Sequence, residues 1–177
     1  GFTDQYEGIR ILTVGRLTYQ KAYDIAIDAM KLVKQSGCKA RWYVLGEGNE
    51  REKLEKKIKE LGLEEDFLLL GAVENPYPYY AQADLYVHAT RFEGKSIAIQ
   101  EAQVLGCPVI ASDCNGNREQ IESGVDGILC KLSPEDIAKC IEELIADPKK
   151  RQIYAKCARE RNKENKEEIN QLLTMMR

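Results

Sequence analysis

Short apolar runs alternate along this chain with longer stretches whose apolar residues recur at helical spacing, and this alternation limits the folds that the chain can adopt. The helical spacing is clearest behind the first run, at Ala22, Ile25, Ala26, Ala29, Leu32 and Val33. Strands are predicted at 9–14, 41–45, 67–70, 85–88, 109–111 and 128–130. Because helical crossovers join parallel strands, the pattern predicts an α/β fold, a three-layer, doubly wound parallel sheet.

Turn and capping residues predict where several helices begin and end. One helix is predicted over 51–61, with Gly62 as its C-terminal stop, and a short helix is predicted over 76–83. Ser133 and Pro134 start the helix after the last strand, since serine caps a helix and proline suits its first position.

The length of 177 residues fits one sizeable domain. Residues 1–8 are predicted to be a linker, 9–147 the sheet domain, and 148–177 a charged C-terminal helical segment. Few apolar residues occur over 160–168, so that part is predicted to fray or to pack on a missing neighbour.

The charge and the cysteine content limit the classes of binding partner and the cellular compartment that the sequence favours. The net charge is −3, so nothing global favours nucleic acid or an anionic membrane as a partner. No apolar run approaches the roughly 18–20 residues that span a bilayer, and the N-terminus lacks the pattern of a signal peptide. The cysteines form no CxxC pair, which favours reduced thiols in a cytoplasmic protein without direct membrane insertion. They stand at 38, 107, 114, 130, 140 and 157.

The stretch 92–102 carries the strongest chemical signal, because two carboxylates frame the predicted start of a helix. Backbone N–H groups from Gly94 to Ser96 are expected to be free at this helix start, where a phosphate can bind. Glu101 lies eight residues beyond Glu93, roughly 12 Å along the axis if the whole span is helical. Carboxylates accept hydrogen bonds from hydroxyl groups, so the spacing predicts a phosphate-bearing ligand with hydroxyls at both ends.

Loops after other predicted strands add cations near the same edge of the sheet. Arg16 follows the first strand, and Lys21 opens the next helix, so both can reach one anion. A solvated surface pair is the alternative for these two residues. His88, the one histidine, ends the fourth strand and is assigned a structural or pocket-wall role. No side chains show metal-ligand spacing, so a metal-independent site without a cofactor is predicted.

Further motifs follow in a fixed order over roughly residues 9–130. They are Val14-Gly15-Arg16-Leu17 with Lys21, Gly46-Glu47-Gly48-Asn49-Glu50-Arg51, Asn75-Pro76-Tyr77-Pro78, Ala83-Asp84-Leu85-Tyr86-Val87 and Gly106-Cys107-Pro108-Val109-Ile110-Ala111-Ser112-Asp113. With the two glutamates, this ordered set resembles the large group 1 family of retaining glycosyltransferases of the GT-B fold. The resemblance implies one Rossmann-like half of that fold, the half that binds the nucleotide-sugar donor.

The resemblance also implies roles for individual residues. Arg16 and Lys21 are expected to hold the donor diphosphate and stabilise it as it leaves. Glu93 is expected to contact the donor sugar, which makes these three the catalytic candidates, while Glu101 contacts the ribose. Further donor contacts are expected from Gly15, Val73 (near the base), Gly94, Lys95 and Ser96.

Two positions depart from the family pattern. Lys95 replaces a phenylalanine after the glutamate-glycine pair, so the resemblance does not identify the donor sugar. Asn115-Gly116 replaces a commoner Gly-Gly, and this segment either lines the sugar side or caps a helix.

The expected reaction is transfer of a hexosyl unit, with configuration kept, from a nucleoside diphosphate sugar to a hydroxyl during polysaccharide or glycolipid assembly. UDP is the default nucleotide. The N-terminal acceptor-binding half is missing, so this chain alone is expected to transfer little, and any membrane association is expected through that half. A nucleotide-sugar epimerase domain and a non-catalytic nucleotide-binding module are the alternatives.

Overall fold

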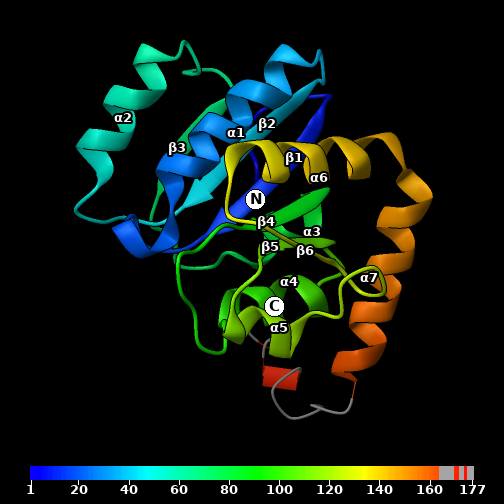
Figure 1. The fold of residues 1–177 in the computed structure, drawn as a ribbon. Helices are drawn as coiled ribbons and strands as arrows, with labels where there is room; N and C mark the ends of the chain where they lie inside the picture. The colour runs from blue at the N-terminus through cyan, green and yellow to red at the C-terminus, as the bar shows by residue number, and fades with distance from the viewer. Residues whose placement is uncertain (164–169, 172–173, 175–177) are drawn as a thin grey trace.

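A six-stranded, all-parallel sheet forms the centre of the protein, which is described here by a computed structural model (Figure 1). The structure describes residues 1–163, 170, 171 and 174. In space the strands run β3-β2-β1-β4-β5-β6. Their bounds are β1 Ile9–Val14, β2 Ala40–Leu45, β3 Phe67–Gly71, β4 Leu85–His88, β5 Val109–Ser112 and β6 Ile128–Cys130. The predicted α/β fold is confirmed, and three of the predicted strands are each one residue too short.

Helices cover both faces of the sheet, which makes the fold three-layered and doubly wound (Figure 1). The helices α1, α2 and α6 pack on one face, and α3 and α4 pack on the other. Their bounds, with those of a short 3-10 helix η1, are η1 Tyr19–Lys21, α1 Tyr23–Gln35, α2 Arg51–Glu60, α3 Tyr77–Gln82, α4 Ile97–Val104, α5 Asn115–Gln120, α6 Pro134–Ala146 and α7 Pro148–Asn162.

Alternation along the central strands feeds two apolar cores. On β1, Ile11 belongs to the core under α1, α2 and α6, and Leu12 belongs to the core under α3 and α4. Polar atoms inside the first core are paired: Trp42 Nε1 donates to Thr13 Oγ1 at 2.9 Å, and Thr13 Oγ1 donates to the Val87 carbonyl at 2.6 Å. Both faces of the sheet are therefore covered by apolar cores, and a polar ligand has access at the strand ends.

The start of α4 differs from the prediction. Ser96 has extended backbone angles and its hydroxyl accepts the Ile99 N–H at 3.2 Å, so Ser96 is the N-cap and the helix begins at Ile97. Ile97, the first residue of the helix, is 71% exposed. Glu93 therefore precedes the helix, and the estimate of its separation from Glu101 along one helix axis is wrong.

The segment 1–8, predicted as a linker, contains no helix or strand, and it contacts the body of the domain. Asp4 accepts hydrogen bonds from the Tyr43 hydroxyl at 2.6 Å and from Arg10 at 2.7 Å. The Phe2 ring lies 4.5 Å from the ring of Tyr43. These contacts fix the direction in which the chain enters β1, while the division at residue 8 stays a prediction.

The helix α7 runs along one side of the molecule and packs on α4 and α6 (Figure 1). Its buried residues are Tyr154, Ala155, Ala158 and Asn162. The predicted fraying concerned 160–168, of which 164–168 lie outside the described residues. Up to Asn162 the segment is a regular helix, because small and aromatic residues at helical spacing give it one face to bury.

Candidate functional site

The order of the sheet reverses between β1 and β4, and this is where the predicted site residues meet. In doubly wound sheets of this order, ligands bind beyond the carboxyl ends of the strands at such a reversal. Lys21, the last residue of η1 after β1, and Glu93, in the loop after β4, form an ion pair of 2.7 Å across it. Arg91 ties the same loops together, with a bidentate pair to Asp24 at 2.9 and 3.1 Å.

The backbone beside Lys21 is unusual. Ala22, the next residue, has φ 49° and ψ 37°, and it is completely buried. A residue other than glycine in this left-handed region costs on the order of 1 kcal/mol, so the surrounding packing must impose it. The turn between η1 and α1 aims Lys21 at Glu93.

His88 completes a three-residue cluster around one carboxylate oxygen. Its Nε2 lies 2.9 Å from Glu93 Oε2, the oxygen that also accepts from Lys21 Nζ. His88 is buried, and its Nδ1 lies 3.3 Å from the Tyr86 hydroxyl. His88 thus contacts Glu93 directly, a contact that the sequence did not predict.

The contacts within the cluster shift the pKa values of Glu93 and His88. Hydrogen bonding to His88 and the neighbouring Lys21 lower the pKa of Glu93 to about 2, although partial burial acts in the opposite direction. Burial lowers the pKa of His88, with the Lys21 charge adding to this and Glu93 opposing it. At neutral pH the cluster therefore holds an ionised carboxylate, an ammonium group and a neutral imidazole.

These shifts predict how stability depends on pH. Glu93 has a folded pKa below its ordinary value of 4.5, so its contribution is present above pH 4.5 and is lost as the pH falls toward 2. The lowered pKa of His88 also makes stability fall with falling pH. As the pH drops below about 6.5, the unfolded chain binds a proton at His88 before the folded protein does. We expect Glu93→Gln to lower the free energy of unfolding by about 1–3 kcal/mol at pH 7 and by less at pH 3, where the carboxyl group of the unfolded chain is already protonated.

Urea unfolding of both proteins at several pH values measures this difference. Asp4 and Asp24 also have lowered pKa values, but they are present in both proteins, so their contributions cancel in the difference. Glu52→Gln, at an exposed position of α2, is the matched control. An equal loss of stability in Glu93→Gln at pH 7 and pH 3 would contradict the expected result.

Glu101 occupies the second turn of α4, where two tyrosines of α3 face it. The Tyr80 hydroxyl donates to Glu101 Oε2 at 3.0 Å. Burial raises the pKa of Glu101, and hydrogen bonds from Tyr80 and Tyr77 partly offset this. The Tyr80 ring lies 5.4 Å from the ring of Tyr86, which reaches His88. A continuous chain of buried side chains therefore joins the two carboxylates.

A hollow of about 390 Å³ lies beyond the carboxyl ends of β1, β2 and β3. It contains three of the predicted donor residues, Gly15, Arg16 and Val73, and Arg16 is exposed at its edge. The other lining residues are Val14, Leu45, Gly46, Glu47, Ala72 and Pro76. A methyl group added to Gly15 would lie 3.6 Å from Lys21 Cε, so the hollow adjoins the Lys21–Glu93 pair.

Close backbone contact shapes the hollow and requires glycine at position 46. A Cβ there would lie 2.0 Å from the Gly15 carbonyl oxygen. The Gly46 and Gly48 turn therefore supports the loop after β1, and it does not continue into a dinucleotide-binding motif.

The segment Glu93–Ser96, here called the 93–96 loop, is only partly as predicted. Gly94 and Lys95 are exposed. The Ser96 N–H, expected to be free, instead donates to Gln120 Oε1 at 2.7 Å, so that expectation is wrong. Binding of a donor by these residues stays a prediction.

Sequence reasoning missed several residues that contact the predicted site residues. Tyr77 and Tyr80 were given no role, although they are three apart and so share one face of α3. Gln120 carried no signal, because a glutamine at the end of a short helix has no distinguishing pattern. Asn115 was offered as a helix cap, but Cys114 is the N-cap of α5 and Asn115 is its first residue.

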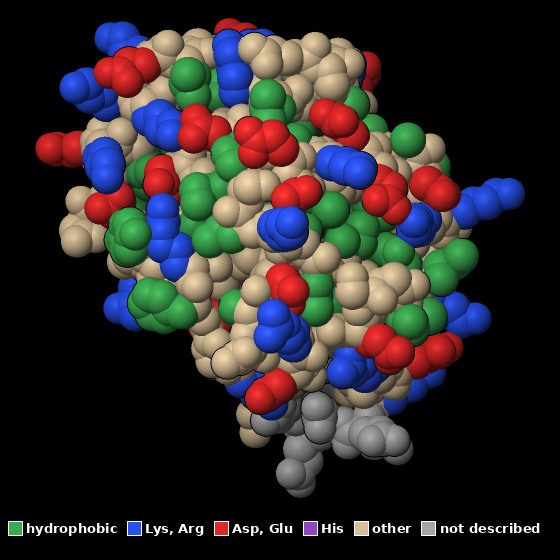
Figure 2. All heavy atoms as spheres, viewed as in Figure 1, with side chains coloured by type: hydrophobic (Ala, Val, Ile, Leu, Met, Phe, Trp, Pro, Cys, Tyr) green, Lys and Arg blue, Asp and Glu red, His purple; other side chains and the backbone are tan. Residues whose placement is uncertain are grey.

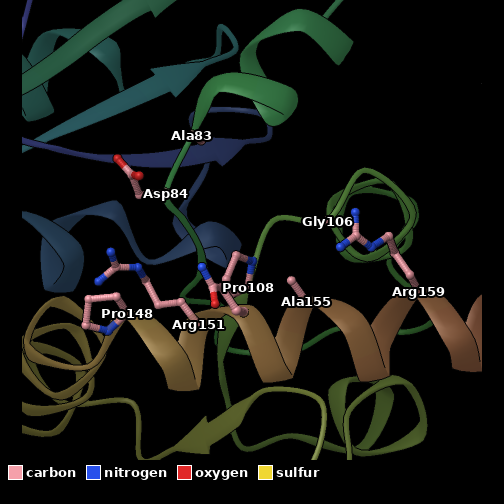
Figure 3. A pocket seen from close by; sticks show the side chains of 9 residues that line it. Ala83, Asp84, Gly106, Pro108, Pro148, Arg151, Ala155 and Arg159 are labelled. Atoms are coloured by element: carbon pink, nitrogen blue, oxygen red, sulfur yellow. The ribbon is translucent and has the colours of Figure 1, made fainter.

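A second hollow, of about 320 Å³, lies at the opposite edge of the sheet (Figure 3). There, Arg151 and Arg159 of α7 face Asp84, Gly106 and Pro108. Arg151 donates to the carbonyls of Leu144 and Ile145, so its side chain caps the C-terminal end of α6. We therefore assign the site to the carboxyl edge of the sheet, where the predicted residues lie.

The surface and the side-chain clusters add two observations. On the face shown in Figure 2, cationic and anionic side chains are interspersed, as expected from the net charge of −3. Among the described residues, no three or more histidine, cysteine, aspartate or glutamate side chains are grouped to hold a metal ion. Nor does that part of the chain contain a helix that is long and apolar enough to cross a membrane.

Known proteins are similar to this chain in both fold and sequence. HepE from Anabaena, solved in complex with UDP, superposes with a TM-score of 0.83 at 27% identity, over 96% of this chain and 48% of HepE. The C-terminal domain of the group 1 glycosyl transferase LpcC from Francisella tularensis superposes with a TM-score of 0.79, also at 27% identity. That match covers 88% of this chain and 85% of the LpcC domain.

Curated relatives include a Campylobacter jejuni enzyme named N-acetylgalactosamine-N,N'-diacetylbacillosaminyl-diphospho-undecaprenol 4-alpha-N-acetylgalactosaminyltransferase. It is 34% identical over 155 residues, which are 86% of this chain and 42% of the enzyme. The amylovoran biosynthesis glycosyltransferase AmsD from Erwinia amylovora is 31% identical over 84% of this chain and 42% of AmsD. This chain thus spans less than half the length of these relatives. The model of the family "Glycosyl transferases group 1" matches residues 5–161, and the chain therefore belongs to the group 1 glycosyltransferases.

Proposed function

We propose that this chain is the nucleotide-sugar-binding, C-terminal half of a retaining GT-B glycosyltransferase. The observation that carries the proposal is the Lys21–Glu93 ion pair of 2.7 Å at the reversal of the strand order, beside the hollow edged by Arg16. Two cations and an acid at this point suit a diphosphate joined to a polyhydroxy group.

Each catalytic candidate has a role that follows from its position. Arg16 and Lys21 stabilise the negative charge that develops on the diphosphate as it leaves the sugar. Glu93 presents a carboxylate whose Oε2 is occupied by Lys21 and His88, and its Oε1 accepts a hydroxyl of the donor sugar. The low pKa of Glu93 keeps this acceptor ionised throughout the physiological range.

The remaining donor contacts lie around the same edge. Glu101, positioned by Tyr77 and Tyr80, accepts the ribose hydroxyls. Val73 in the hollow contacts the base, while Gly15, Gly94 and Lys95 contact the phosphates and sugar. Ser96, whose polar groups are engaged by Gln120 and Ile99, positions these residues. UDP is the proposed nucleotide, which the UDP complex of HepE supports.

The reaction that we propose is transfer of a hexosyl unit, with configuration kept, to a hydroxyl group of a growing polysaccharide or glycolipid. The names of the C. jejuni and E. amylovora relatives support this substrate class. The superposition on the LpcC C-terminal domain supports the assignment to the C-terminal half. An N-terminal half would bind the acceptor and provide any membrane association, so this chain alone transfers little or no sugar.

Two further parts of the proposal concern chemistry and location. The cations at the site would neutralise the leaving diphosphate without a metal ion. The free thiols, several of them partly accessible, suit a reducing compartment and so a cytoplasmic location.

Calorimetric titration of this chain with UDP, GDP, ADP and their sugars tests the proposal. We expect UDP and at least one UDP-sugar to bind, with affinities at least about 10-fold higher than those of GDP and ADP, because one base fits the contacts near Val73. A radiolabelled transfer assay on the same chain is expected to detect no turnover above background. Binding of nucleotides without any dependence on the sugar would favour a non-catalytic module, and binding of none would reject the donor site.

A further inference from the structure

The short helix α5 lies directly beneath the 93–96 loop. A Cβ added to Gly116 would lie 2.0 Å from the Gly94 carbonyl oxygen and 2.3 Å from the Glu93 carbonyl oxygen. Backbone therefore touches backbone here, and only glycine leaves enough space. The position of the loop that carries Glu93 is set by α5.

Gln120, the last residue of α5, holds the far end of the same loop by two hydrogen bonds. Its Oε1 accepts the Ser96 N–H at 2.7 Å, and its Nε2 donates to the Ser96 carbonyl at 2.8 Å. One side chain thus grips both polar groups of one residue, which fixes the orientation of Ser96 as well as its position.

The backbone of Gln120 is itself anchored by two buried amide side chains. Gln103 Nε2 donates to the Gln120 carbonyl at 2.9 Å, and Asn162 Nδ2 donates to Gln103 Oε1 at 3.2 Å. Asn162 also donates to the Ala158 carbonyl at 2.7 Å, within α7. The amides connect the 93–96 loop to α4 and α7, and they are costly to leave unpaired because they are buried.

Capping of α4 does not account for the contacts of Gln120. The Ser96 hydroxyl already caps the helix by accepting the Ile99 N–H. Gln120 instead accepts the Ser96 N–H, which belongs to the peptide bond between Lys95 and Ser96, and donates to the Ser96 carbonyl, which also accepts the Gln100 N–H at 3.3 Å.

We propose that Gln120 is a positioning residue for the donor sugar: by fixing Ser96 it holds the 93–96 loop so that Glu93, Gly94 and Lys95 face the sugar. This inference rests on the proposed function. It predicts that Gln120 affects the sugar end of the donor, whereas the nucleoside end depends on Glu101 and the hollow at Val73.

Calorimetric titration of Gln120→Met with UDP and with the UDP-sugar that the wild-type chain binds tests this role. Methionine keeps the length of the side chain and removes both hydrogen bonds. We expect UDP to bind within about 2-fold of the wild type and the ratio of the two dissociation constants, UDP-sugar over UDP, to rise about 10-fold, because small misplacements of contact groups are costly. Gln120→Glu, which keeps the acceptor for the Ser96 N–H, should restore part of the ratio.

Gln152→Met, the same change at an exposed position of α7, should leave the ratio unchanged. An unchanged ratio in Gln120→Met would overturn the positioning role while leaving the proposed function intact. If that variant does not fold, Gln120→Glu is judged by the same ratio. Failure of the wild-type chain to bind either ligand would reject the proposed function and this role with it.

Discussion

Replacing Lys21 by methionine is expected to weaken the binding of UDP and of UDP-sugar by about 10–100-fold. A hydrogen bond to a charged group contributes about 1.5–3 kcal/mol, which corresponds to a loss of this size. The affinities for both ligands should fall equally, because both carry the diphosphate that Lys21 is proposed to bind. Titration calorimetry on the purified chain measures the two dissociation constants.

The structure adds a consequence for the free protein. Lys21 is the partner of Glu93 at 2.7 Å, so its removal should raise the pKa of Glu93 and leave His88 as the remaining partner. Lys57→Met is the matched control, since Lys57 pairs with Asp28 at 2.8 Å between α1 and α2, away from the strand ends. The diphosphate role of Lys21 is excluded if Lys21→Met binds UDP within 2-fold of the wild type.

Glu101→Gln is expected to weaken UDP binding by about 10–100-fold through the ribose. A carboxylate accepts from two ribose hydroxyls, whereas the amide offers one acceptor oxygen and a donor that cannot accept. The Tyr80 and Tyr77 hydroxyls can donate to the remaining oxygen, so the fold should be kept.

Comparison of UDP with 2′-deoxy-UDP identifies the contact. The wild-type chain should prefer UDP, and Glu101→Gln should bind the two nucleotides almost equally, because the partner of the missing hydroxyl is gone. Glu52→Gln, at an exposed position on α2, should behave as the wild type. A preference for UDP that survives in Glu101→Gln would show that another group recognises the ribose.

Local pattern predicted much of the fold, and the reasons are visible in particular elements. The apolar run of β4 gave its bounds correctly as 85–88, because a strand buried on both faces needs no polar residue until it ends. The start of α4 was misplaced, because Ser96 has extended backbone angles and caps the helix with its hydroxyl, and its N–H is held by Gln120, which lies 24 residues later in the chain.

The sequence by itself determined the classes of element and the candidate residues, because periodicity and short motifs are local properties of the chain. Only the tertiary structure decided which of those residues meet. Lys21 and Glu93 are 72 residues apart, and they form a pair because β1 and β4 are neighbours in the sheet. No local pattern specifies that neighbour, since the order of strands follows from how all the helices share the two faces. The contact of Gln120 with Ser96, 24 residues apart, also depends on tertiary packing.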